Sequence, residues 1–321
     1  MSPKPEQFPL PENFPPTETL YFPPITPTVS SPLLFFLPGN PGLVNYYTSF
    51  LAQLSIAHPN LHILAASHAG FHPDEPQLHK GYSWKWGPQP WGLDAQVKMK
   101  TELLQFAVEK LGDKNRRVLL VAHSMGAYLS LEMITGLKKA TKEGSKILGG
   151  IMLFPTVLEI ADSPQGRLLM PLLGSRIVRG AASWAAWGFS WLKEWQVKML
   201  VKILTGQDPE AAETTRQLVT TPHVVEQALV LAEEEMRRIT TDRWEEEVWG
   251  CEGRMVYVFG QKDHWVAEKT REGIMAKARG GGKYVLEETG LKHGFCVSQG
   301  ERMAEVVKVK GWINDIVGEE K

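Results

Sequence analysis

Ser124, Asp263 and His293 follow one another along the chain in the order serine, acid, histidine, and each lies beyond a short apolar run. A serine hydroxyl becomes a good nucleophile when an imidazole takes its proton, and a carboxylate fixes the tautomer of that imidazole. These three residue types therefore predict acyl-transfer chemistry through a covalent acyl-enzyme.

The surroundings of Ser124 are typical of a nucleophile elbow, a sharp turn between a strand and a helix. The apolar run Val118–Val121 leads into a His-Ser-Met-Gly turn at residues 123–126, and a helix-forming stretch follows. We expect the backbone to be crowded at Ala122 and Gly126, which favours small residues there. Ala122 stands where the G-x-S-x-G pattern has glycine, so the motif alone also fits a turn whose serine caps the next helix.

Asp263 is the candidate acid because it follows the strand-like run Met255–Phe259. The carboxyl ends of parallel strands lie at one edge of a sheet, so we expect Asp263 at the same edge as Ser124. A plain turn-forming role is the alternative, since aspartate after glycine is common in turns. Asp162 and Asp242 are weaker candidates, because no strand-like run precedes them.

His293 is the candidate base. An α/β-hydrolase has the chain order serine, acid, histidine, and His293 lies in the loop before the final predicted helix. His123 and His264 adjoin Ser124 and Asp263, so we expect their side chains to point away from the reacting groups. The remaining histidines precede Asp263 and do not fit the order.

An oxyanion formed on the substrate needs two N–H donors. We expect one from the backbone of Met125, directly after the nucleophile. The other is expected from the backbone of Asn40, in the loop Pro38–Gly42 after the strand-like run Leu33–Leu37. The Asn40 side chain either helps to stabilise the oxyanion or only shapes the turn.

The elements that must position these residues alternate between strands and helices. We therefore predict an α/β-hydrolase fold, with a mostly parallel sheet covered by helices on both faces. Residues 33–154 and 251–321 form the predicted core, and residues 1–32 a proline-rich extension or edge strands. The remaining predicted strands and the two clearest predicted helices are Leu61–Ala65, Gly149–Pro155, Lys283–Leu286, Asp94–Leu111 with Asp94 as its cap, and Met303–Val317.

Residues 155–250 carry helical patterns without strands and are predicted to form a helical lid over the active site. The segment His223–Ile239 is predicted to be an ordinary solvated amphipathic helix. Four tryptophans recur at steps of three and four and would line one helical stripe. Such a stripe usually packs on the body or across a dimer, but tryptophan also favours a lipid interface. The stripe consists of Trp184, Trp187, Trp191 and Trp195.

The stripe is not predicted to span a membrane, because Lys193, Glu194, Lys198 and Lys202 interrupt the apolar run. The chain has 35 basic and 36 acidic residues, so its charge does not indicate nucleic-acid binding. Two distant cysteines are expected to remain thiols, and the N-terminus does not resemble a secretory signal, so we expect a protein that faces the cytosol. Neither a metal nor an organic cofactor is predicted.

Several of these motifs together resemble the lipid-droplet-associated hydrolase family of α/β-hydrolases. The family has glycine at the position of Ala122, where this chain departs from it. The resemblance implies a serine hydrolase at the lipid-droplet or endoplasmic-reticulum surface that acts on lipid or sterol esters. It is carried by Leu37–Leu43 with Tyr46 and Phe50, Ser67–Gly70, His123–Tyr128, Asp162–Gly166, Asp263–Val266 and His293–Phe295.

The predicted activity is therefore carboxylic ester hydrolysis by Ser124, His293 and Asp263. A lipid-droplet binding or tethering protein with a weak or inactive triad is the alternative from another class. An acyltransferase or a thioesterase would use the same three residues.

Overall fold

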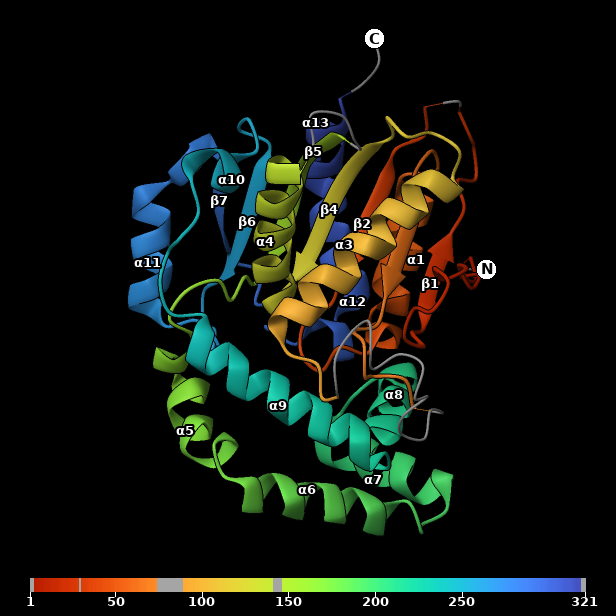
Figure 1. Ribbon diagram of the computed structural model, residues 1–321, viewed down its shortest axis with the longest axis vertical. Coiled ribbons are helices and arrows are strands. Elements are labelled where there is room, and N and C mark those ends of the chain that lie inside the picture. The colour runs from red at the N-terminus through yellow and green to blue at the C-terminus, as the bar shows by residue number, and fades with distance from the viewer. Residues whose placement is uncertain (1–2, 29, 74–88, 141–145, 319–321) are drawn as a thin grey trace.

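One mixed sheet forms the centre of the computed structural model, which describes residues 3–28, 30–73, 89–140 and 146–318. Within these residues the seven strands run in the order β1-β3-β2-β4-β5-β6-β7 (Figure 1). β1 pairs antiparallel with β3 at one edge, and all other neighbours are parallel. The predicted α/β-hydrolase architecture is confirmed. The strands are β1 Thr19–Phe22, β2 Leu33–Leu37, β3 His62–Ala66, β4 Arg117–His123, β5 Lys146–Leu153, β6 Met255–Gly260 and β7 Lys283–Glu287.

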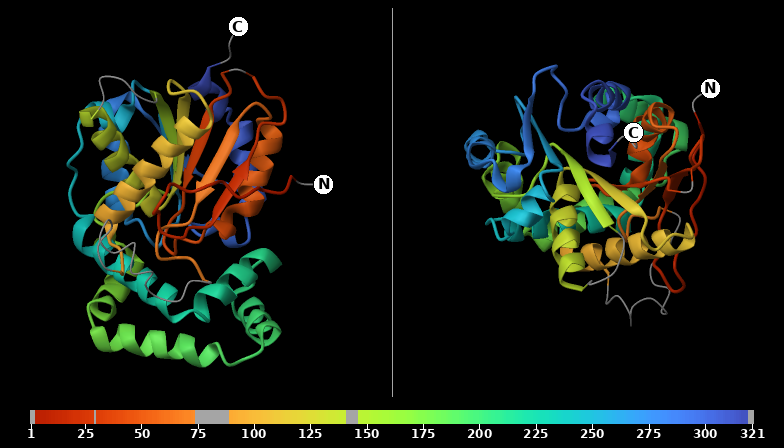
Figure 2. Two further views of the ribbon diagram at one scale, coloured as in Figure 1. Left: turned by 45° about the vertical axis from the view of Figure 1, so that its right-hand side comes forward. Right: turned by 90° about the horizontal axis from the view of Figure 1, so that it is seen from above.

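Helices cover both faces of the sheet, which is why the central strands are almost wholly apolar. All five residues of β2 are buried, as are all six residues of β6. Helices α3 (Leu93–Lys110) and α4 (Met125–Ala140) cover one face, and α1 (Thr48–Ala57), α12 (Gly300–Val309) and α13 (Trp312–Val317) cover the other (Figure 2). α11 (Glu268–Lys277) lies at the β6 and β7 end (Figure 1).

Most of the segment between β5 and β6 forms a separate layer of helices across the end of the body to which the strands point (Figure 1). We call α5 to α9 the lid. Its small apolar cluster of Val197, Val201 and Ala212 joins α7 to α8. The lid helices are α5 Pro164–Leu173, α6 Arg176–Phe189, α7 Glu194–Thr205, α8 Pro209–Val219 and α9 Pro222–Arg238, and α10 (Glu246–Gly250) follows them.

Two details of the predicted helices are wrong. The expected single helix Met303–Val317 is broken into α12 and α13 at Gly311, whose φ of 67° lies in the left-handed region that glycine tolerates. The cap of α3 is Gly92 rather than Asp94. Asp94 instead lies in the first turn of α3, where its carboxylate accepts a hydrogen bond from Arg238 of α9 at 2.6 Å.

None of the helices in the described ranges is both long enough and apolar enough to cross a bilayer. Cys251 and Cys296 are both free thiols.

Candidate active site

Ser124 lies at a sharp turn between β4 and α4. Its φ of 55° is left-handed, a conformation that non-glycine residues rarely adopt outside constrained turns. A Cβ atom on Gly126 would lie 2.4 Å from the Leu37 carbonyl oxygen and 2.7 Å from that of Pro38. The need for glycine at 126 therefore comes from the end of β2. Ala122 is fully buried in β4 and pairs with Leu37 and Met152 on the neighbouring strands.

The three predicted residues meet at the carboxyl ends of the strands. His293 Nε2 lies 2.9 Å from Ser124 Oγ, and His293 Nδ1 lies 2.9 Å from Asp263 Oδ2. The other carboxylate oxygen of Asp263 accepts the backbone N–H of Trp265 at 2.8 Å, which fixes the orientation of the carboxylate. Only 8% of Ser124 and 2% of the Asp263 side chain are exposed. This geometry allows a proton to pass from the serine hydroxyl to an imidazole that a buried carboxylate orients.

The expectation that the His123 side chain points away from the reacting groups is wrong. His123 Nε2 lies 2.8 Å from the main-chain oxygen of His293, and since a carbonyl only accepts, Nε2 carries the proton. Nδ1 then accepts from the Tyr47 hydroxyl at 2.7 Å, and that hydroxyl accepts the N–H of Gly39 at 3.1 Å. Burial and the nearby His293 lower the pKa of His123 well below its ordinary value, which keeps this ring neutral.

The loop after β2 packs directly on Ser124. A Cβ on Gly39 would lie 3.0 Å from Ser124 Cβ, so this loop needs glycine for its close approach. The next residue is Asn40. On the other side of Ser124, Met125 is the first residue of α4, so its N–H has no partner within the helix. The two predicted oxyanion donors therefore belong to the two segments next to Ser124 in space, the loop after β2 and the start of α4.

The Asn40 side chain makes its hydrogen bonds to the lid and not to its own loop. Its Nδ2 atom donates to Ala228 O at 3.0 Å and to Glu235 Oε1 at 2.8 Å, and both acceptors belong to α9. Burial raises the pKa of the Glu235 carboxyl to about 8.

Helix α9 is not the ordinary solvated amphipathic helix expected. Its buried side includes the polar residues Gln227 and Glu235. The Gln227 amide exchanges two 2.8 Å hydrogen bonds with the backbone of Trp91, and the backbone N–H of Leu93 donates to Glu234. These polar contacts seat α9 on the body. A hydrophobic pattern does not reveal them, since Gln227 and Glu235 lie within a buried helix face.

Two buried titratable groups support the loops around the site. The Lys100 ammonium donates to Ala66 O and Ser67 O, both at 2.6 Å, and burial lowers the Lys100 pKa to about 7. His68 Nε2 donates to Pro38 O at 3.1 Å, and burial together with Lys100 holds the His68 pKa well below its ordinary value. Both groups bind main-chain carbonyls, so they are suited to fixing the backbone in and beside the loop Pro38–Gly42.

The four tryptophans do not lie on one helix and do not pack on the body. Trp184 and Trp187 belong to α6, Trp191 follows it, and Trp195 belongs to α7. They are 68%, 49%, 72% and 60% exposed in that order, so packing against the body is ruled out. The Trp187 ring makes edge contacts with the rings of Trp184 and Trp191, with centroid-to-centroid distances of 5.5 and 5.2 Å. We group the four tryptophans with the other exposed apolar side chains of residues 164–205 under the name apolar lid face: Leu168, Met170, Leu172, Ile177, Val178, Trp184, Trp187, Phe189, Trp191, Leu192, Trp195, Met199, Leu200, Ile203 and Leu204.

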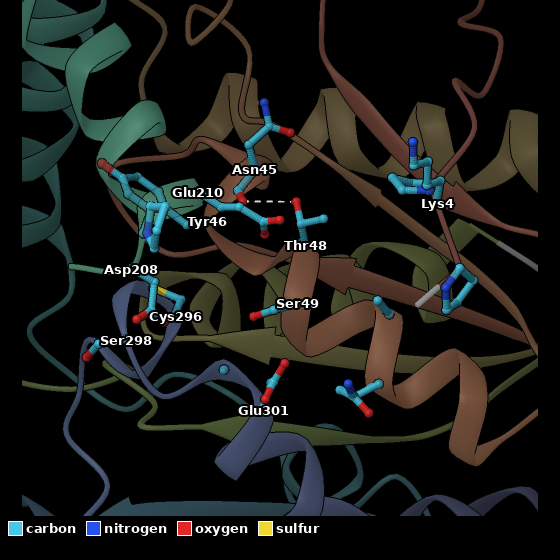
Figure 3. Close-up of a pocket in the computed structure, with 17 residues that line it drawn as sticks. Lys4, Asn45, Tyr46, Thr48, Ser49, Asp208, Glu210, Cys296, Ser298 and Glu301 are labelled. Atoms are coloured by element: carbon cyan, nitrogen blue, oxygen red, sulfur yellow. Dashed lines mark hydrogen bonds between the residues drawn. The ribbon is translucent and has the colours of Figure 1, made fainter. Parts of the chain in front are cut away.

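A cavity of about 550 Å³ lies beside α1 and the start of α8 (Figure 3). Tyr46, Cys296 and Ser298 line it, together with Asp208 and other polar residues, but Ser124, Asp263 and His293 do not. Burial raises the pKa of the Cys296 thiol to about 12, which keeps it protonated. Within the described ranges, His, Cys, Asp and Glu side chains form no group of three or more that could hold a metal.

Comparison with known proteins gives a consistent result. The family model "Lipid-droplet associated hydrolase" matches residues 30–296. The lipid droplet-associated hydrolase of Gallus gallus is 28% identical over 289 residues, which cover 88% of this chain and 85% of that protein. The corresponding protein of Mus musculus is 25% identical over 297 residues, covering 89% and 86%.

Solved structures show the same fold at low sequence identity. A bacterial membrane phospholipase A superposes with a TM-score of 0.60 at 14% identity, covering 94% of this chain and 84% of that one. A thermophilic esterase from Thermogutta terrifontis gives a TM-score of 0.55 at 14% identity and covers 94% of both chains.

Proposed function

Because this chain belongs to the lipid-droplet-associated hydrolase family, we propose that it is a serine hydrolase that cleaves carboxylic esters of lipids or sterols at the lipid-droplet surface. The observation that carries the proposal is the chain of two 2.9 Å contacts from Ser124 Oγ through His293 to Asp263. The left-handed turn at Ser124 supports it, since this turn presents the hydroxyl at the strand ends.

The reaction follows from these contacts. Ser124 Oγ attacks the ester carbonyl carbon while His293 Nε2 takes the hydroxyl proton, and Asp263 stabilises the resulting imidazolium. The backbone N–H groups of Asn40 and Met125 stabilise the oxyanion. The alcohol leaves with the proton from His293, and an acyl group remains on Ser124. Water then attacks the acyl-enzyme, again with His293 as base, and releases the carboxylic acid.

The apolar lid face supports action at a lipid surface. Figure 1 shows α6 and α7 on the side of the lid remote from the sheet, and their exposed side chains include Trp184, Trp187 and Trp195. Tryptophan favours the boundary between acyl chains and head groups, so this face is suited to contact a phospholipid monolayer. We infer that the lid rests on the droplet and brings Ser124 close to its esters.

The test compares the wild type with Ser124→Ala. We expect a fluorophosphonate probe to label the wild type alone, and the wild type alone to hydrolyse members of a panel of short-chain, glyceride and sterol esters. Labelling or hydrolysis that survives in a folded Ser124→Ala protein would exclude Ser124 as the nucleophile.

The apolar lid face also favours a second function, in which the protein binds or tethers lipid droplets and turns over little substrate. Under that function Ser124→Ala leaves the cellular lipid-droplet phenotype intact, whereas replacing the exposed tryptophans abolishes it. If the protein acts by ester hydrolysis, cells that carry Ser124→Ala should show the same lipid-droplet phenotype as cells that lack the protein.

A further inference from the structure

We propose that Glu235, on lid helix α9, is a positioning residue that holds the oxyanion loop Pro38–Gly42 in place through the side chain of Asn40. The lid would then complete the active site as well as cover it. This inference rests on the proposed function, because it assigns to Asn40 a backbone donor for the oxyanion.

The direction of the Asn40 side chain is fixed by α9. The Ala228 carbonyl can only accept, so the atom of Asn40 that lies 3.0 Å from it must be the amide nitrogen. The same nitrogen donates its second proton to Glu235 Oε1 at 2.8 Å. The Asn40 Oδ1 atom is buried and has no hydrogen-bond partner among the described residues. Asn40 therefore leaves one acceptor unpaired while both of its donors bind α9, and these contacts decide where the side chain lies.

Glu235 occupies a costly position for a carboxyl group. It is only 4% exposed, and among the described residues none of the ion pairs involves it. Burying a carboxylate without a cation is unfavourable, and burial accordingly raises the pKa of Glu235, so the neutral acid predominates at neutral pH. The hydrogen bond to Asn40 is the polar interaction that Glu235 makes in this buried position.

Other contacts already attach α9 to the body. Gln227 binds the backbone of Trp91, and Glu234 accepts the backbone N–H of Leu93. Arg238 binds Asp94 at 2.6 Å. The Glu235 contact is distinct from these because it ends on the oxyanion loop, where Gly39 packs against Ser124. A shift of the Asn40 side chain is thus transmitted to the backbone next to the nucleophile.

The test measures kcat and KM on a soluble short-chain ester, together with the rate of fluorophosphonate labelling. For Glu235→Ala we expect kcat to fall about tenfold or more with KM within about twofold, since misplacing an oxyanion donor acts on the transition state. Glu235→Gln should keep most of the activity, because its amide oxygen accepts the same hydrogen bond. Asn40→Ala should match Glu235→Ala, and the double variant should lose little more than either.

Glu226→Ala is the matched control, since Glu226 is an exposed glutamate on the same helix, and it should retain wild-type rates. Circular dichroism shows whether each variant folds, and Asn40→Ala tests the same contact if Glu235→Ala unfolds. Wild-type kcat in folded Glu235→Ala, or additive losses in the double variant, would overturn the proposal. A wild type without Ser124-dependent activity would instead overturn the proposed function.

Discussion

His123 donates from Nε2 to the main-chain oxygen of His293 over 2.8 Å, so the residue before Ser124 holds the loop that carries the proposed general base. The same ring contacts Tyr47, which binds the backbone of Gly39 in the proposed oxyanion loop. One neutral imidazole thus connects three segments whose relative positions set the active-site geometry. Ser124 and His293 are 169 residues apart, and a hydrogen bond of 2.9 Å between them requires both loops to be fixed.

Replacing His123 should impair catalysis without touching a reacting atom. His123→Phe keeps an aromatic ring, but it leaves the buried His293 carbonyl without the donor Nε2 and the Tyr47 hydroxyl without the acceptor Nδ1. We expect kcat to fall about tenfold to a hundredfold and the free energy of unfolding to fall by about 1–3 kcal/mol. Steady-state kinetics and urea unfolding measure the two effects. His264→Phe, at an exposed histidine beside Asp263, is the control, and equal losses in the two variants would contradict the role of His123.

The elbow predicts opposite effects for two glycines of α4. Gly126→Ala places a methyl group 2.4 Å from the Leu37 oxygen, and backbone must shift to relieve the clash. We expect it to lower the free energy of unfolding by about 1–3 kcal/mol. Gly136→Ala meets no atom within 4 Å and should stabilise the protein by about 1 kcal/mol through helix propensity. Urea unfolding of both variants checks this, and a neutral Gly126→Ala would show that the elbow is less crowded than described.

Glu235 predicts a pH dependence of stability. Its pKa is about 8 in the folded protein against an ordinary value of 4.5. Between these values the folded chain keeps a proton that the unfolded chain releases, so this group lowers the free energy of unfolding as the pH rises through that window. Among the described residues, the side chain that faces it with a hydrogen bond is the uncharged amide of Asn40. Glu235→Gln removes the titration and should gain stability relative to the wild type as the pH rises.

Urea unfolding at about pH 5 and about pH 8 measures the effect, with Glu226→Gln as the control for removing a charge from α9. A stability difference between Glu235→Gln and the wild type that stays constant across this range would contradict the assignment.

The apolar lid face predicts binding to lipid surfaces. Replacing Trp184, Trp187, Trp191 and Trp195 together by serine should abolish flotation with phospholipid-coated triglyceride droplets. The rings are exposed, so the fold and the activity on a soluble short-chain ester should persist. A matched variant that replaces Ile25 and Ile56, exposed apolar residues outside the lid, should float like the wild type. Full flotation of the tryptophan variant would remove this face from the binding mechanism.

Much of the fold was readable in the sequence because it depends on local patterns. The all-apolar run of β2 was predicted with its observed bounds, Leu33–Leu37, because a strand buried on both faces requires such a run. The break between α12 and α13 was missed, because a single glycine within an apolar helical pattern does not reveal its φ.

The prediction of the candidate catalytic residues depended on their order in the chain and on their positions after strands, which can also be read from the sequence. The sequence by itself determined that a serine, an acid and a histidine emerge at one edge of a parallel sheet. Tertiary structure alone decided which polar groups support them. Asn40 and Glu235 are 195 residues apart, and Tyr47 and His123 are 76 apart. Such pairs follow from how buried donors and acceptors meet once the layers pack, and no periodicity along the chain records that.

The tryptophan segment shows the same division. Its spacing predicted an apolar stripe, but the same spacing suits a core helix and a surface helix. The turn after α6 and the packing of α6 on α9 leave the rings in solvent. A helix face is buried only where another element packs on it. The packing of distant segments arises only in the tertiary structure, so the sequence spacing cannot decide whether the tryptophans are buried.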